Sequence, residues 1–242
     1  MVHTLPDYTT KYRMTTVFGN LDTGEIAARL GSPDTYDRRG AVIWYDDFNS
    51  PTLKWRTGSN GAGYSFDIST AQSFRGDSAL KITTPNVSGK TAYIYKSFGR
   101  PAAARLGYEV SFTRKDTMSY FLFRMRGLLN DISTSAAIKY IPGTSTLQYE
   151  DIDGNYQTFA TDAEMGAQDF EFCTLKFVAD FATHKYARCM FTNKTYDLSS
   201  YAMGQTGAVA TDYIQLDLYA VIGENNSRVV YIDDLIFTNN EP

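Results

Sequence analysis

The sequence predicts an all-β protein built as a β-sandwich or jelly roll. Aromatic residues make up 14% of the 242 residues, with 18 Tyr and 15 Phe against 2 Trp. Short apolar or alternating segments recur from Ala41 onward, and Gly, Asn, Asp and Pro separate them. Aromatic and β-branched side chains suit a pleated surface better than a helix. Many short strands between turn residues are typical of sandwiches and jelly rolls.

The composition narrows the class of protein. Hydrophobic residues make up 43% and charged residues 21%, and 23 basic against 27 acidic residues give a net charge of −4. This balance argues against a disordered chain and provides no basic surface for nucleic acid. No segment approaches the roughly 18 apolar residues of a membrane-spanning helix. Asp7 interrupts the region where a secretory leader would be apolar. We therefore expect synthesis in the cytoplasm without a signal peptide, and neither a membrane nor a nucleic-acid partner.

Residues 1–40 predict an N-terminal arm ahead of one sandwich domain over residues 41–242. The arm is polar, contains repeated Gly and Pro, and shows no sustained alternation. Asp22 and Glu25 form a capping-box pair and Gly31 follows as a stop, so one short helix is expected there. Two interpretations of the arm stay open. It reaches onto a neighbouring subunit, or it packs back and covers an edge strand of its own sandwich.

Twelve segments after residue 40 predict the strands in chain order. They are AVIWYDDF (41–48), ALKITT (79–84), TAYIYKSF (91–98), LGYEVSFTR (106–114), SYFLFRMRG (119–127), AAIKYI (136–141), TLQYEDI (146–152), NYQTFAT (155–161), CTLKFVAD (173–180), KYARCMF (185–191), YIQLDLYAV (213–221) and RVVYIDDLIF (228–237). Within 148–159, Asp153-Gly154 matches a two-residue hairpin turn with positive φ at both central residues. A second hairpin turns through residues 181–184.

The two cysteines are predicted to be free, buried thiols. The hairpin turn at 181–184 places Cys173 and Cys189 opposite residues other than each other, at best as diagonal neighbours. That separation strains disulfide geometry. Neither cysteine belongs to a CxxC pair that would indicate a zinc site.

The sequence argues against catalysis. A glycosidase on a sandwich needs two carboxylates flanking one bond. The nearest acidic cluster, Glu150, Asp151 and Asp153, is explained by the predicted hairpin turn. His3 and His184 are far apart and have no Ser or Cys motif beside them, so no nucleophilic triad is indicated. We therefore expect a protein that is not an enzyme and lacks hydrolase activity.

Paired acidic residues occur near both ends of the predicted domain, at Asp46-Asp47 and Asp233-Asp234. Carboxylates inside apolar strands carry a desolvation cost that a hard cation would relieve. The alternative is that alternation turns one Asp of each pair toward solvent while the other caps a strand end. Periodicity does not decide between these two interpretations.

Three segments resemble the frame of jelly-roll carbohydrate-binding modules and of the wider concanavalin A-like and laminin G-like sandwiches. They are WYDDFNSPTLKW (44–55), FRGDSALKITT (74–84) and VVYIDDLIFT (229–238), and the resemblance extends over residues 41–238. FCTLKFVADFATHKYARCMFTNKTYDLSS (172–200) is similar to a laminin G-like hairpin. This resemblance implies a concanavalin-like fold and the function of a carbohydrate-binding module.

The resemblance also implies a structural calcium as the one cofactor. Its ligands would be Asp47, the backbone around Gly76 and Asp77, and Asp233, with Asp234 as the competitor of Asp233. Asn49 departs from the pattern, because those modules often carry Glu at this position.

A further resemblance concerns the arm and the end of the chain. AARLGSPDTYDRRGAVIWYDDF (27–48) and IDDLIFTNNEP (232–242) are similar to proteins encoded beside tail and capsid genes of bacteriophages. This resemblance implies a virion-associated structural protein, either a capsid decoration or a tail component. Its partners would be copies of itself or capsid and tail proteins, contacted through the arm. We take this as the first functional hypothesis, with the virion as the expected location.

A carbohydrate-binding module that recognises a polysaccharide or cell-surface glycan is the alternative. Tyr95, Tyr120, Arg124 and Tyr219 lie at positions that share strand faces with other polar residues. A concave sheet that exposes Tyr and Arg would stack against a sugar and hydrogen-bond it. The competing interpretation is that each Tyr packs in the core with its hydroxyl at the rim. A glycoside hydrolase or lyase of the same fold is a more distant third hypothesis.

Overall fold

The computed structural model describes residues 37, 39–101, 104–113, 117–129, 132–166, 171–206 and 213–242. The chain divides into two units, Met1–Thr35 and Tyr36–Pro242. The first described strand begins at Ala41. The predicted arm helix lies outside the described residues, so the arm and its boundary stay a prediction. No helix in the described part of the chain has the length and apolar composition needed to cross a membrane.

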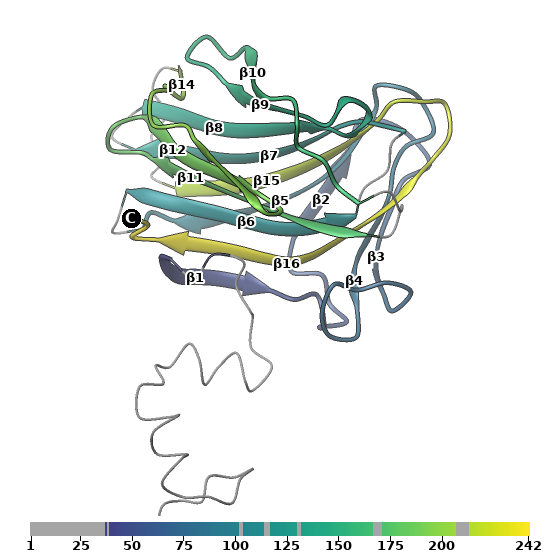
Figure 1. The fold of residues 1–242 in the computed structure, drawn as a ribbon. Coiled ribbons are helices and arrows are strands. Elements are labelled where there is room, and N and C mark those ends of the chain that lie inside the picture. Colours follow the sequence, from purple (N-terminus) through teal and green to yellow (C-terminus); the bar gives the residue numbers. More distant parts are fainter. Residues whose placement is uncertain are drawn as a thin grey trace, which may run out of the picture. The chain divides into compact units, whose positions relative to one another are not determined.

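Two antiparallel sheets pack face to face as a β-sandwich (Figure 1). Sheet A has the order β13-β12-β11-β6-β16-β4-β3, with β1 beside β16. Its strands are β13 (Lys194–Asp197), β12 (Lys185–Phe191), β11 (Phe172–Asp180), β6 (Arg105–Thr113), β16 (Val229–Asn239), β4 (Ala79–Thr83), β3 (Ser65–Ser69) and β1 (Ala41–Asp46). The predicted all-β sandwich is confirmed.

Sheet B has the order β10-β9-β8-β7-β15-β5-β2, with β14 beside β8. Its strands are β10 (Tyr156–Ala160), β9 (Thr146–Glu150), β8 (Ile132–Ile141), β7 (Met118–Leu129), β15 (Tyr213–Ile222), β5 (Thr91–Gly99), β2 (Arg56–Ser59) and β14 (Gly204–Thr206). Within the described ranges the only helical element is one 3-10 turn, η1 (Pro142–Thr144). The central strands β7 and β15 are therefore flanked on both sides, and only their two faces are open to packing or ligands.

The core lies between the sheets and is rich in aromatic rings. Phe112 of β6 contacts Phe121, Phe123 and Tyr140 of sheet B, with ring centroids 5.0, 4.9 and 6.0 Å apart. All four side chains are fully buried. Alternation places such residues on one face of each strand and leaves the other face for different chemistry.

The β9–β10 hairpin differs from the predicted two-residue turn. Residues 151–155 form a longer loop, and of the Asp153-Gly154 pair only Gly154 has positive φ, at 81°. Asp151 Oδ1 accepts the amides of Asp153 and Asn155 at 3.0 and 2.9 Å. The side chain of Asp151 thereby stabilises a wider loop, so the prediction of a two-residue turn is wrong.

The second hairpin and the free cysteines are confirmed. Residues 181–184 connect β11 to β12, and Cys189 lies opposite Phe177 while Cys173 lies opposite Phe112 of β6. Both cysteines are free and buried. Burial raises the pKa of the Cys189 thiol, which keeps it protonated and unreactive.

A buried cluster of charges lies on the outer face of sheet A. We call Asp37, Glu109, Lys176, Arg188 and Glu241 the ionic clasp. Lys176 Nζ lies 3.2, 4.0 and 2.8 Å from carboxylate oxygens of Asp37, Glu109 and Glu241, and its side chain is 1% exposed. Arg188 Nη2 contacts Asp37 at 3.3 Å and Glu241 at 2.5 Å. The clasp therefore holds both ends of the described domain against β11 and β12.

Two local features make the clasp possible. A Cβ on Gly107 would lie 2.7 Å from Glu241 Oε1 and 2.4 Å from Thr238 Oγ1, so only glycine leaves room for the Glu241 carboxylate. Although burial opposes it, the hydrogen bond from Arg39 and the charge of Lys176 lower the pKa of Asp37. Asp37 thus stays ionised opposite Lys176.

We expect Lys176→Met to destabilise the protein by about 3–5 kcal/mol, because it leaves buried carboxylates without their cation. Urea unfolding measures this change. Lys185→Met, at an exposed lysine on β12, is the matched control and should shift the free energy of unfolding by less than about 0.5 kcal/mol. If Lys176→Met changes the free energy of unfolding by as little as the control, the clasp does not stabilise the protein.

Candidate functional site

The outer face of sheet B gathers tyrosines and charged side chains on seven strands. We call it the tyrosine–arginine face. It consists of Arg56 on β2, Tyr93 and Tyr95 on β5, Tyr120, Arg124 and Arg126 on β7, Ser135 and Lys139 on β8, Glu150 on β9, Tyr156 on β10, and Gln215, Asp217 and Tyr219 on β15. The neighbours of these residues along β7 and β15, such as Phe123 and Leu218, are fully buried in the core.

Strand register arranges the face in rows that run across the strands. Tyr219 lies opposite Tyr93 on β5, and Asp217 lies opposite Tyr95 on β5 and Arg124 on β7. The Tyr93 and Tyr219 ring centroids are 5.3 Å apart, and those of Tyr93 and Tyr95 are 6.3 Å apart. A Cβ on Gly58 of β2 would lie 2.4 Å from the Tyr93 ring. The missing side chain therefore lets the Tyr93 ring lie over the edge strand.

A hydrogen-bonded group of three residues orders the centre of the face. Arg124 Nε donates to Asp217 Oδ2 at 2.9 Å, and Arg124 Nη2 donates to the Tyr219 hydroxyl at 2.5 Å. Asp217 is 1% exposed, and Gln215 Nε2 donates to its other oxygen at 2.6 Å. Although burial opposes it, the Asp217 charge raises the pKa of Arg124. Burial and Asp217 raise the pKa of Tyr219, which keeps its proton available for donation to a ligand.

A lysine between two aromatic rings marks the other side of the face. Lys139 Nζ lies 4.9 Å from the Tyr120 ring centroid and 3.4 Å from that of Tyr156. Burial lowers the pKa of Lys139, opposed by Glu150. The Ser135 hydroxyl donates to the Glu150 carboxylate. These contacts join β7, β8, β9 and β10 into one surface.

The structure places all four sequence-predicted ligand residues, Tyr95, Tyr120, Arg124 and Tyr219, on this face. Sequence reasoning missed Arg126, Lys139 and Tyr156. The signal for Arg126 was present, because it lies two positions after Arg124 on the same strand and so shares its face. Lys139 and Tyr156 could not be found this way, since their place depends on the order of the strands.

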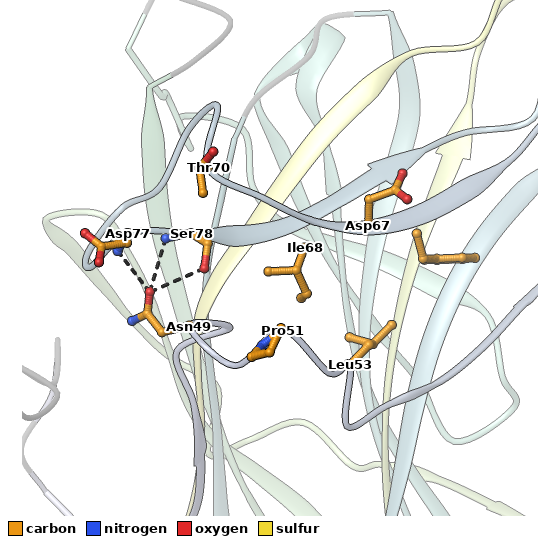
Figure 2. Close-up of a pocket in the computed structure, with 9 residues that line it drawn as sticks. Asn49, Pro51, Leu53, Asp67, Ile68, Thr70, Asp77 and Ser78 are labelled. Carbon is orange, nitrogen blue, oxygen red and sulfur yellow. Dashed lines mark hydrogen bonds between the residues drawn. The ribbon is translucent and has the colours of Figure 1, made fainter.

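The predicted calcium ligands lie in a different region and make other bonds. Asn49 Oδ1 accepts the amides of Asp77 and Ser78 at 2.9 and 3.1 Å (Figure 2). Asp47 Oδ1 accepts the amide of Asn49 at 3.2 Å. Asp233 is fully buried, and its Oδ2 accepts the amides of Phe74 and Arg75 at 2.8 and 3.1 Å. Direct hydrogen bonds therefore attach the 74–78 loop to β16 and to the segment after β1.

Asp47, Asp77 and Asp233 are not grouped as three side-chain ligands, and the calcium site implied by the resemblance stays a prediction. In the described ranges no three His, Cys, Asp or Glu residues are grouped so that they could hold a metal ion. The alternative that one Asp of the second acidic pair faces solvent is wrong. Asp233 and Asp234 are 0% and 4% exposed, and Asp234 accepts a hydrogen bond from the Tyr45 hydroxyl at 2.8 Å.

Asn49 also borders a separate open groove of about 600 Å³ (Figure 2). The groove is lined by Asn49, Pro51, Leu53, Phe66, Asp67, Ile68, Thr70, Asp77 and Ser78. Its lining is largely aliphatic on one side and includes two carboxylates. None of these residues belongs to the tyrosine–arginine face, so the two regions are distinct.

No protein-family model matches the sequence, and no curated protein is significantly similar to it. Solved structures do share the fold. An endo-β-1,4-glucuronan lyase from the fungus Trichoderma reesei is 13% identical with a TM-score of 0.57, over 83% of this chain and 96% of that chain. The cellulose induced protein Cip1 is 10% identical with a TM-score of 0.52, over 81% and 96%. A carbohydrate-binding module structure from the β-sandwich superfamily is 10% identical with a TM-score of 0.46, over 86% and 64%.

The likenesses to the lyase and to Cip1 confirm the concanavalin-like jelly-roll fold. They also correct the expectation that the protein is not an enzyme. That expectation is wrong, because an enzyme shares the fold and an enzymatic activity is therefore not excluded. That expectation rested on the missing pair of carboxylates, a requirement of glycoside hydrolysis. The fold is shared with a lyase, and elimination chemistry does not require that pair. The virion role and the bacteriophage resemblance stay predictions.

We expect Asp233 to make stability depend on pH. Burial raises its pKa to about 7, although the amides of Arg75 and Asp234 lower it. The folded state thus holds a proton that the unfolded chain releases near pH 4. The stabilisation from this bound proton is complete below about pH 4 and is lost as the pH rises to about 7. Urea unfolding from pH 4 to 8 should show a steeper loss of stability for the native chain than for Asp233→Asn. Parallel curves would contradict the assignment.

We expect the melting temperature to be the same in excess calcium and in excess chelator, because Asn49 and Asp233 already make the loop-to-strand bonds. Differential scanning calorimetry of the full chain measures this. A calcium-dependent rise that disappears in Asp47→Ala would instead establish the calcium site implied by the family resemblance.

Proposed function

We propose that this protein binds a polysaccharide on the tyrosine–arginine face of sheet B. The observation that carries the proposal is the ordered group of Arg124, Asp217 and Tyr219 beside the Tyr93 and Tyr95 rings. Aromatic rings and directed polar groups on one surface are the two elements that a sugar requires. Ring faces pack against the apolar C–H surface of a pyranose, while hydroxyl groups need donors and acceptors at fixed positions.

The extent of the face suits a polymer better than a single sugar. One row of side chains follows Tyr93, Tyr219, Leu122 and Lys139 across β5, β15, β7 and β8. Neighbouring strands lie about 4.8 Å apart, so this row spans about 14 Å. Polar groups occur on both sides of the tyrosines. A polysaccharide that crosses the strands would therefore contact several ordered side chains in succession.

The buried ion pair prepares the site before a ligand arrives. Asp217 fixes Arg124, and Arg124 in turn donates to the Tyr219 hydroxyl. Because these side chains are already ordered, binding loses little of their rotamer freedom. Tyr219 uses its oxygen as an acceptor toward Arg124, and its own proton remains for a second hydrogen bond. A sugar hydroxyl or ring oxygen supplies such an acceptor.

The comparisons support a glycan-related function. The lyase of the same fold is named for a polysaccharide, and the carbohydrate-binding module structure concerns sugar recognition. The virion hypothesis depends on the arm, of which the structure describes only residues 37, 39 and 40. No contact in the described part of the chain favours that hypothesis over glycan binding.

We expect Tyr93→Ala to weaken polysaccharide binding at least tenfold, about 1.4 kcal/mol, because it removes the ring that lies next to both the Tyr95 and the Tyr219 rings. Affinity electrophoresis in gels that contain neutral or acidic polysaccharides measures the dissociation constants. Tyr64→Ala, an exposed tyrosine outside the face, is the matched control and should bind like the native chain. Circular dichroism should show that both variants are folded.

Two outcomes would contradict the proposal. One is that no polysaccharide in the panel retards the native chain. The other is that Tyr93→Ala and Tyr64→Ala bind a retarding polysaccharide with equal affinity.

A further inference from the structure

We infer that the polysaccharide is anionic and that Arg126 pairs with its carboxylate groups. This inference rests on the proposed function and names the class of polysaccharide that would bind the same face. It follows from the charge balance of the face, from the weak pairing of Arg126, and from the neutral side chains beside Arg126 in its row.

The face carries more positive than negative charge. Four cations belong to it, Arg56, Arg124, Arg126 and Lys139, whereas its acidic residues are Asp217 and Glu150. The full chain has a net charge of −4, so the positive charge of this face is opposite in sign to that of the whole molecule. Asp217 pairs with Arg124 at 2.9 Å. The remaining cations therefore outnumber the remaining carboxylate on this surface.

Arg126 lacks the pairing that Arg124 has. Its Nη2 lies 3.5 Å from Asp217 Oδ2, at the limit of hydrogen bonding. Its Nε is buried and has no hydrogen-bond partner. Asp217 already accepts Arg124 Nε at 2.9 Å and Gln215 Nε2 at 2.6 Å. Since Asp217 is committed to these donors, Arg126 keeps donors for another acceptor.

Arg126 is placed to receive that acceptor from solvent. Its side chain is 36% exposed, so an outside group can reach it. In its row Arg126 lies between Gln215 on β15 and Ser135 on β8, and Ser97 on β5 follows Gln215. All three neighbours are neutral. Glu150 accepts the Ser135 hydroxyl from the next strand along.

The geometry favours a planar carboxylate near a stacked sugar. A guanidinium presents parallel N–H groups that match the two oxygens of a carboxylate. Residues two apart on a strand lie about 7 Å apart on one face. The row of Arg126 is therefore about 7 Å from the row that contains Tyr95 and Arg124. Tyr95 on β5 and Arg126 on β7 are also two strands apart, about 10 Å, so the two residues lie about 12 Å apart on the face. A polymer of uronic acids with one unit stacked on Tyr95 would bring the carboxylate of that unit or of the next one toward Arg126.

The test compares acidic polysaccharides with neutral forms of the same backbone. The probes are polygalacturonate against its methyl ester, and carboxymethyl cellulose against hydroxyethyl cellulose, with dextran sulfate as a sulfated polymer. Affinity electrophoresis and calorimetry at two salt concentrations give the dissociation constants. We expect the native chain to prefer an acidic member of a pair at least tenfold, with weaker binding at high salt.

Substitutions at Arg126 test the assignment directly. Arg126→Gln should lower the ratio of acidic to neutral affinity at least tenfold. Arg126→Lys should give an intermediate ratio, because it keeps the charge and loses the paired donors. Lys185→Gln, at an exposed lysine on sheet A, is the matched control and should keep the native ratio.

The outcomes separate this inference from the proposed function. If Tyr93→Ala weakens binding while Arg126→Gln keeps the native ratio, the carboxylate assignment is wrong and glycan binding stands. Equal binding of dextran sulfate and a carboxylated polymer overturns the preference for carboxylate. Binding of neutral polymers alone overturns the anionic class. If no polymer binds, the proposed function itself fails.

Discussion

The register of three neighbouring strands, β5, β15 and β7, is the constraint on which the site depends. Because side chains alternate across a strand, one register places Phe121, Phe123 and Leu218 in the core and Arg124 and Tyr219 outside. A slip of one residue would exchange these sets and bury the charges. The packing of the core therefore also aligns the polar groups of the outer face.

The buried carboxylate of Asp217 links the stability of sheet B to the order of its outer face. Removing a charge from water is costly unless it is paired and hydrogen-bonded. Arg124 and Gln215 meet that requirement, and Arg124 then orients Tyr219. The same bonds leave Arg126 without an equivalent partner. One carboxylate thus orders Arg124 and Tyr219 and leaves donors of Arg126 unused.

The edges of the sandwich are fastened by side chains in a different way. Asn49 and Asp233 accept backbone amides from the loop between β3 and β4, and the ionic clasp holds Asp37 and Glu241, at the two ends of the described domain, against sheet A. These contacts fasten the loops and end segments to sheet A. They also give the acidic residues near the strand ends a structural use other than the metal site that the resemblance implies. A carboxylate that accepts amide hydrogen bonds has the same sequence pattern as one that binds a metal ion.

Alternation and turn residues by themselves determined the all-β class, the hairpin at 181–184, the free cysteines, and which residues share a face within one strand, such as Tyr120 with Arg124. These features depend on neighbours in sequence, whose geometry follows from the period of a strand. Only the tertiary structure decided that Lys139 and Tyr156 join that face, because their position depends on strand order across the sheet. It also decided that Asp233 is buried among amides, since the 74–78 loop is distant in sequence. The pairing of strands that are distant in sequence depends on the packing of the whole core, so no local sequence pattern predicts it.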